Sequence, residues 1–291
     1  MRPNGARFAM RAERRQRLKG LHINRMIPNV LTLLALAAGL SAVRFALNER
    51  WELAVLAIVV AGILDGLDGR IARILKGASR FGAELDSLSD FLCFGVAPAL
   101  TLYLWSLSQA NQIGWALVLL LCICCALRLA RFNTDIDDEV RPAWTRSYFT
   151  GVPSPAGAGI ALCPMVLWFQ IDADFVRHPA FVGCFVLATS FLLVSRVRTF
   201  TFKRIRVPQR WILPAMLGIG LYLALLFSTP WVTLTLTLLA YVVSIPFSVR
   251  RFEQHRRRQA EQAPPASPEA GATNPAAHAG PPAPIGSPPA R

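Results

Sequence analysis

Long apolar runs recur along the chain and limit the folds that it can adopt, for example residues 115–126 and 231–244. Runs that approach about 20 residues with few charges are typical of membrane spans. Backbone groups in hydrocarbon must pair within their own segment, and these runs lack the polar–apolar alternation of membrane β-strands. The sequence therefore predicts an all-α polytopic membrane bundle of about eight transmembrane helices. Their expected ranges are 28–47, 52–75, 84–106, 111–131, 153–170, 179–197, 210–228 and 231–249.

The composition agrees with burial in a membrane rather than in a soluble core. Hydrophobic residues make up 54% of the chain and charged residues 16%, whereas a soluble domain carries about 25% charged residues. A net charge of +14 would suggest nucleic acid in a soluble protein. Here the basic residues lie between apolar runs, where they set topology, so we expect no nucleic-acid partner.

The distribution of Lys and Arg predicts which side of the membrane each loop faces. Eight basic residues lie in 1–25, six in 196–210 and five in 250–258. The loops expected on the other side hold only Arg50 and Arg177. Because cytoplasmic loops carry the excess of Lys and Arg, both termini are expected in the cytoplasm.

Three regions follow from this topology. Residues 1–27 form a basic cytoplasmic segment, which we expect to be retained because the apolar run after it lacks a small-residue cleavage site. Residues 28–250 form the membrane domain. Residues 251–291 begin with basic residues and continue as a Pro/Ala-rich stretch that cannot bury a core. We expect this tail to be disordered and to have no catalytic role.

Four aspartates lie inside two neighbouring expected spans, where ionisable groups are costly and usually functional. Asp65 and Asp68 are three residues apart, and Asp86 and Asp90 are four apart. Each pair therefore shares one helix face, with a rise of about 4.5 Å and about 6 Å respectively. The two spans are joined by a short turn, so they are antiparallel and both pairs lie near the cytoplasmic end. The sequence predicts that all four carboxylates point into one cavity.

Crowded carboxylates in a low dielectric repel one another, and two divalent cations would offset their combined charge. Oxygen-only ligands suit hard ions such as Mg²⁺ or Mn²⁺, and a two-metal site can hold both the attacking and the leaving oxygen in phosphoryl transfer. Two alternatives remain at this point. The aspartates could form buried salt bridges with Arg70, Arg73 and Arg80, or the protein could be an ion-coupled transporter.

The same region carries a motif of eight residues over 26 positions, which resembles the signature of the CDP-alcohol phosphotransferase family at every defined position. The motif consists of Asp65, Asp68, Gly69, Ala72, Arg73, Gly82, Asp86 and Asp90. This resemblance disfavours the transporter. It implies that a CDP-linked lipid donates a phosphatidyl group to an alcohol in a metal-dependent reaction.

Further segments resemble the bacterial phosphatidylserine synthases of this family. They are Pro28-Asn29 with Thr32, Asp86–Asp90 with Phe94–Ala99, Arg128–Asn133 and Gly151–Pro155. The resemblance implies CDP-diacylglycerol and L-serine as substrates, with membrane lipid around the protein and a homodimer as the assembly. It also implies a location in a bacterial inner membrane, with the active site facing the cytoplasm. The acidic motif is common to the whole family, so glycerol 3-phosphate, inositol or choline remain alternative acceptors.

The resemblance also implies roles for individual residues. Asp65, Asp68 and Asp86 are expected to bind metal, and Asp90 to contact a metal and act as the general base. No histidine lies within an expected span, which leaves a carboxylate as the base. The CDP moiety is expected to contact Gly69, Ala72, Arg73, Gly82, Asn29 and Thr32. The two glycines lack side chains beside the acids, which would allow a nucleotide to approach the backbone.

Arg128 and Arg131 are three residues apart and share one helix face near the cytoplasmic end of the fourth expected span. A guanidinium binds a carboxylate bidentately. We therefore expect one or both arginines to bind the carboxylate of serine or a phosphate. The alternative is that they only set topology and extend toward the membrane interface.

Overall fold

The computed structural model describes residues 4–75, 79–137, 148–195, 198–200 and 212–244. The chain divides into Met1–Arg250 and Arg251–Arg291, and the second unit lies outside the described residues. The regular secondary structure of the described part is helical, except for two strands of three residues each. The prediction of a helical bundle is therefore confirmed for this part of the chain.

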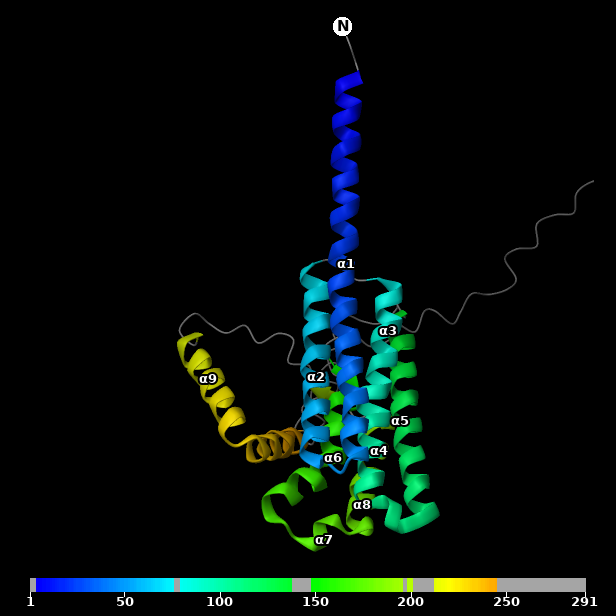
Figure 1. Cartoon of the computed structure of the whole chain (residues 1–291), viewed down its shortest axis with the longest axis vertical. Coiled ribbons are helices and arrows are strands. Elements are labelled where there is room, and N and C mark those ends of the chain that lie inside the picture. The colour runs from blue at the N-terminus through cyan, green and yellow to red at the C-terminus, as the bar shows by residue number, and fades with distance from the viewer. Residues whose placement is uncertain (1–3, 76–78, 138–147, 196–197, 201–211, 245–291) are drawn as a thin grey trace, which may run out of the picture. The chain divides into compact units, whose positions relative to one another are not determined.

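Helical segments occupy the described part of each of the eight expected ranges, and the range 84–106 holds three helices in succession (Figure 1). Residues 196–197, 210–211 and 245–249 of these ranges lie outside the described residues. Four segments are long and apolar enough to cross a membrane, namely Met26–Leu47, Arg80–Trp105, Leu107–Thr134 and Ser154–Ile171. The elements are α1 (Asn4–Leu47), α2 (Trp51–Ile74), α3 (Arg80–Phe91), the π-helix η1 (Leu92–Val96), α4 (Ala97–Trp105), the 3₁₀-helix η2 (Leu107–Ala110), α5 (Asn111–Asp137), β1 (Tyr148–Thr150), α6 (Ser154–Ile171), α7 (Asp174–Arg177), α8 (Pro179–Val194), β2 (Arg198–Phe200), α9 (Ile212–Ser228) and the helix Pro230–Ser244.

A tight turn joins α1 to α2, and the two helices lie side by side (Figure 1). The amide of Arg50 donates to the carbonyl of Phe45 at 2.9 Å, and the side-chain amide of Asn48 donates to the carbonyl of Arg44 at 2.8 Å. Glu49 takes a left-handed conformation with φ of 57°. These contacts satisfy carbonyls at the end of α1 and reverse the chain within three residues.

The packing of α1 against η1 is close enough to require a glycine. A Cβ at Gly39 would lie 2.6 Å from Sγ of Cys93. The Cys93 thiol donates to the carbonyl of Ala35 at 3.3 Å, and the Ser89 hydroxyl donates to the carbonyl of Thr32 at 3.4 Å. Small residues thus let the backbones approach, as in other membrane helix pairs. This packing sets the position of α3 relative to α1 and α2.

Further contacts join helices at the end of the bundle where α7 lies. The Ser106 hydroxyl donates to the carbonyl of Arg177 at 2.6 Å, and Nε of Arg177 donates to the carbonyl of Trp105 at 3.1 Å. The Arg177 guanidinium also lies over the ring of Trp168. These contacts hold α7 to the end of α4.

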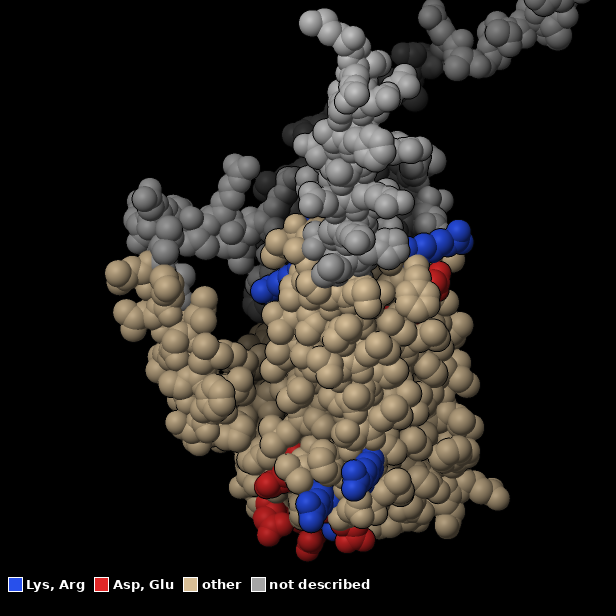
Figure 2. All heavy atoms as spheres, turned by 45° about the horizontal axis from the view of Figure 1, so that its top comes forward, with Lys and Arg blue, Asp and Glu red and all other residues tan. Residues whose placement is uncertain are grey.

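The short strands β1 and β2 pair antiparallel, with Phe149 opposite Thr199. They connect the segments that precede α6 and follow α8. On the face shown in Figure 2, the charged side chains of the described residues gather at two ends, and uncharged residues form a broad band between them. Such a band is what a helix bundle presents to lipid.

Candidate active site

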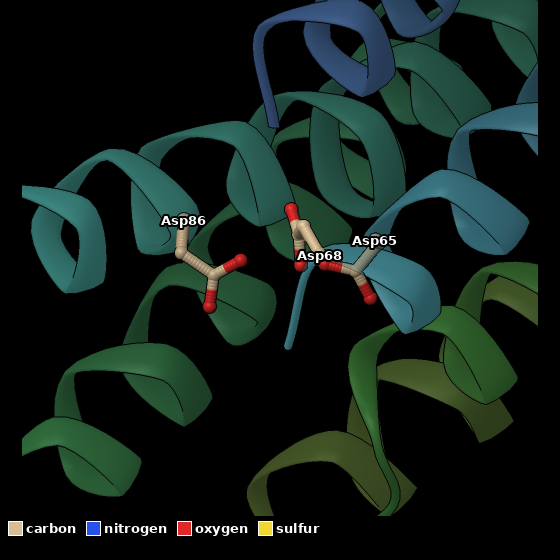
Figure 3. A group of neighbouring side chains, drawn as sticks. All are labelled: Asp65, Asp68 and Asp86. Atoms are coloured by element: carbon tan, nitrogen blue, oxygen red, sulfur yellow. The ribbon is translucent and has the colours of Figure 1, made fainter. Parts of the chain in front are cut away.

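Three carboxylates from two helices converge on one point. Asp65 and Asp68 come from α2 and Asp86 comes from α3, and one oxygen of each lies within 4.8 Å of the others. Figure 3 shows the three side chains turned toward one another. The convergence predicted from the sequence is therefore confirmed for these three residues. A group of three carboxylate oxygens at this spacing can hold a divalent cation.

The start of α3 places Asp86 at this point. Ser79 precedes the helix in an extended conformation, and its hydroxyl accepts a hydrogen bond from the amide of Gly82 at 3.0 Å. This is an ordinary N-cap, which fixes the first residue of the helix. Asp86 then lies on the second turn of α3, facing α2.

Asp68 is held by a residue of α1. The Thr32 hydroxyl lies 2.7 Å from Oδ2 of Asp68 and 3.1 Å from the carbonyl oxygen of Pro28. Thr32 and Asp68 are each only 4% exposed. The hydrogen bond engages one oxygen of the Asp68 carboxylate. The sequence suggested Thr32 only as a nucleotide contact and gave no sign of this link to an acidic residue.

Asp90 lies beside the group of three rather than within it. Its carboxyl is within hydrogen-bonding reach of Asp65. Its Oδ1 is buried and has no hydrogen-bond partner among the described residues. Among those residues, the group that could hold a metal ion contains Asp65, Asp68 and Asp86. The arrangement is therefore three convergent carboxylates with a fourth adjacent to one of them.

The two motif glycines have different surroundings. A Cβ at Gly69 would meet nothing within 4 Å, which agrees with the expectation of open space. A Cβ at Gly82 would lie 2.8 Å from Oδ1 of Asn29. The space beside Gly82 is thus already taken by Asn29, and this glycine allows α3 to approach α1.

Arg73 and Ala72 lie at the C-terminal end of α2. Nε of Arg73 donates to the carbonyl of Gly69 at 2.9 Å, and the side chain is exposed. Ala72 is half-buried. The backbone contact orients the Arg73 side chain one turn beyond Asp68, on the same helix as two of the acids.

Arg128 on α5 is directed into the bundle. It is 9% exposed, and its Nη1 donates to Oγ of Ser154 at 2.6 Å. It also interacts electrostatically with Asp90, and its guanidinium lies over the ring of Phe132. Arg128 therefore lies close enough to Asp90 to interact with it.

Arg131, predicted to share this role, has a different environment. Its Nη1 donates to the carbonyl of Val194 at 3.0 Å and its Nη2 to the carbonyl of Ser195 at 3.4 Å. Both carbonyls lie at the C-terminal end of α8, and a cation at this end of a helix stabilises the helix. Gly151, with φ of +87°, passes close to the same guanidinium. In the described structure Arg131 joins α5 to α8.

Three polar residues that position the site were given no role from the sequence. The side-chain amide of Asn133 donates to the Ser87 hydroxyl at 2.9 Å, which joins α5 to α3 one residue after Asp86. Ser154 is the partner of Arg128. All three lie in segments that resemble phosphatidylserine synthases, but their pairing depends on contacts between helices.

A helical bundle of membrane character that brings three carboxylates together is an arrangement in which a membrane-embedded enzyme can hold a divalent cation. Residues 25–195 match the CDP-alcohol phosphatidyltransferase family, so the chain belongs to that family. Residues 210–246 match a second description, CDP-alcohol phosphatidyltransferase 2. The four aspartates, Arg128 and Ser154 all lie within the first match.

Several curated relatives share one name, which is more specific than the description of the family. The chain is 40% identical to a CDP-diacylglycerol–serine O-phosphatidyltransferase of Mycobacterium leprae over 77% of this chain and 74% of the relative. A protein of the same name from Helicobacter pylori J99 is 32% identical over 75% and 88%. Another from Bacillus subtilis is 33% identical over 61% and 92%.

Proposed function

We propose that this protein transfers the phosphatidyl group of CDP-diacylglycerol to the hydroxyl of L-serine, giving phosphatidylserine and CMP. The observation that carries the proposal is the convergence of Asp65, Asp68 and Asp86 in a chain of this family. The names of the relatives support serine as the acceptor.

The donor set fits a hard divalent cation, because it consists of carboxylate oxygens. Asp65, Asp68 and Asp86 would hold Mg²⁺ or Mn²⁺, and Asp90 lies close enough to Asp65 to contribute to a second ion. When bound, such ions neutralise negative charge on the phosphates during transfer. Thr32 supports this role by restraining the carboxylate of Asp68 before an ion arrives.

Asp90 is the proposed general base. The serine hydroxyl is too weak an acid to ionise unaided at neutral pH, so a positioned acceptor must take its proton. The proton moves to the carboxylate of Asp90 as the serine oxygen forms a bond to the phosphatidyl phosphorus. The bond between that phosphorus and the CMP oxygen breaks, and CMP leaves. The buried Oδ1 of Asp90, without a partner among the described residues, supports this assignment.

The remaining motif residues are proposed to face the two substrates. The open space at Gly69 and the exposed guanidinium of Arg73 suit the CDP moiety. Ala72 and Asn29 would line the same pocket. Gly82 and Thr32 would act there through their packing, Gly82 against Asn29 and Thr32 against Asp68. Arg128 is proposed to bind the serine carboxylate. Arg131, held by the end of α8, would act mainly by keeping α5 in place.

The topology is also part of the proposal. Eight spans, with both termini and the acidic group on the cytoplasmic side of a bacterial inner membrane, would account for the distribution of basic residues. The regions would be residues 1–27, 28–250 and 251–291, and the assembly a homodimer. Charged side chains at the two ends of the face in Figure 2 support a membrane-embedded middle.

One assay tests the function directly. Purified protein is incubated with CDP-diacylglycerol, Mg²⁺ or Mn²⁺, and one alcohol at a time, and CMP release is measured. We expect release with L-serine and little with inositol, glycerol 3-phosphate or choline. Release with one of those alcohols instead of serine would assign the protein to another acceptor class within the family.

A further inference from the structure

Arg128 carries hydrogen-bonding capacity that the described protein does not use. It is 9% exposed, and its Nε is buried with no hydrogen-bond partner among the described residues. A buried guanidinium with an unsatisfied N–H is costly unless a ligand or a neighbour engages the group. Among the described residues, its Nη1 donates a hydrogen bond to Oγ of Ser154, which is the first residue of α6.

Ser154 has a hydrogen that remains available for a ligand. Its Oγ accepts from Nη1 of Arg128 at 2.6 Å, and the Cys125 thiol lies 3.9 Å away as a second donor. Both contacts use the serine oxygen as an acceptor. A hydroxyl has one donor and two acceptor positions, so its hydrogen can be donated to a third group beside the guanidinium.

The start of α6 favours an anion at this place. Pro153 occupies the N-cap position, and its side chain cannot accept a hydrogen bond from the first-turn amides. The helix continues for 18 residues, so its N-terminus carries a partial positive charge. The helix end, the Ser154 hydroxyl and the Arg128 guanidinium therefore all attract negative charge to one point.

We propose that Arg128, the Ser154 hydroxyl and the N-terminus of α6 form one binding subsite for the carboxylate of the acceptor amino acid. In L-serine only two carbon atoms separate the carboxylate from the reacting hydroxyl, so the carboxylate must bind close to the general base. Arg128 meets that requirement, because it interacts with both Asp90 and Asp65. Ser154 acts as a positioning residue for Arg128 and as a hydrogen-bond donor to the carboxylate. This inference rests on the proposed function.

Steady-state kinetics of Ser154→Ala test the subsite. We expect the KM for L-serine to rise about tenfold, with little change in kcat or in the KM for CDP-diacylglycerol, because a charge-assisted hydrogen-bond network is lost on the acceptor side. Discrimination between L-serine and serinol, which has a hydroxymethyl group in place of the carboxylate, should fall by a similar factor. Ser154→Thr keeps the hydroxyl, whereas Ser154→Val has the same shape as Ser154→Thr but no hydroxyl. The KM for L-serine should therefore be much lower in Ser154→Thr than in Ser154→Val.

Ser106→Ala is the matched control. Ser106 is also fully buried and makes a 2.6 Å hydrogen bond, but to the carbonyl of Arg177 at the other end of the bundle. Ser106→Ala should leave the KM for L-serine unchanged. An unchanged KM for L-serine in both Ser154→Ala and Ser154→Val would overturn the inference. A rise in the KM for CDP-diacylglycerol without a rise in the KM for L-serine would also overturn it, because the subsite would then bind a phosphate.

The failure of this inference can be told apart from failure of the proposed function. If Arg128→Lys raises the serine KM and the Ser154 variants do not, Arg128 binds the carboxylate alone and the subsite is wrong. If the wild-type protein releases no CMP with serine, the proposed function itself is wrong.

Discussion

The hydroxyl of Thr32 on α1 donates a 2.7 Å hydrogen bond to Oδ2 of Asp68 on α2, although the two residues are 36 positions apart. Both side chains are almost fully buried. A hydrogen bond of this kind restrains a carboxylate in one orientation before it binds an ion. The contact therefore connects the packing of α1 with the affinity of the acidic group.

Replacement of Thr32 should weaken metal activation. In Thr32→Val we expect the Mg²⁺ or Mn²⁺ concentration for half-maximal CMP release to rise by about 10-fold or more, because loss of a residue that orients a ligand commonly costs that much in metal affinity. Thr32→Ser should lie near the wild type. Thr101→Val is a suitable control, because Thr101 is also buried and, among the described residues, donates to the carbonyl of Ala97 on its own helix. The same rise of the half-maximal metal concentration in Thr101→Val would indicate a general loss of packing rather than loss of the hydrogen bond to Asp68.

Asp90→Asn should remove the proton acceptor while keeping the shape of the side chain. We expect kcat for CMP release to fall by about 10² or more, as for loss of a general base. Metal-dependent stabilisation of the protein in a thermal shift experiment should persist, since Asp65, Asp68 and Asp86 are intact. Full turnover by this variant would exclude Asp90 as the base.

Removal of divalent cations should abolish activity reversibly. Chelation with EDTA is expected to stop CMP release, and addition of Mg²⁺ or Mn²⁺ should restore it. In Asp86→Ala the restoration should fail at concentrations that saturate the wild type, because one of the three convergent carboxylates is missing. Undiminished activity after exhaustive chelation would contradict a metal-dependent mechanism.

Gly82→Ala and Gly69→Ala should separate packing from ligand binding. A Cβ at Gly82 would lie 2.8 Å from Oδ1 of Asn29, so Gly82→Ala should destabilise the protein by about 1–3 kcal/mol through overpacking. The double variant with Asn29→Ala should recover much of that stability. Gly69→Ala meets open space, so it should leave the thermal midpoint nearly unchanged and instead raise the KM for CDP-diacylglycerol. Equal destabilisation by both single variants would contradict this reading.

Much of this protein could be predicted from local sequence alone. Apolar runs of membrane length require helices, because backbone groups in lipid have no other partners. The spacing of Asp65, Asp68 and Asp86 places them on two facing helix surfaces, and the structure brings them together as expected. Periodicity and burial cost were sufficient for these conclusions because both act over a few neighbouring residues.

Contacts between distant helices could not be predicted in this way. Thr32 reaches Asp68 and Arg128 reaches Ser154 across 36 and 26 residues. Arg128 and Arg131 share a helix face in sequence, yet the first is directed to the start of α6 and the second to the end of α8. Which neighbour a side chain meets depends on how the helices approach one another, and small residues such as Gly39 and Gly82 set that approach. The sequence by itself determined the helices and the acidic group. The tertiary structure decided how each polar side chain around that group is oriented, because orientation depends on packing between segments that are far apart in the chain.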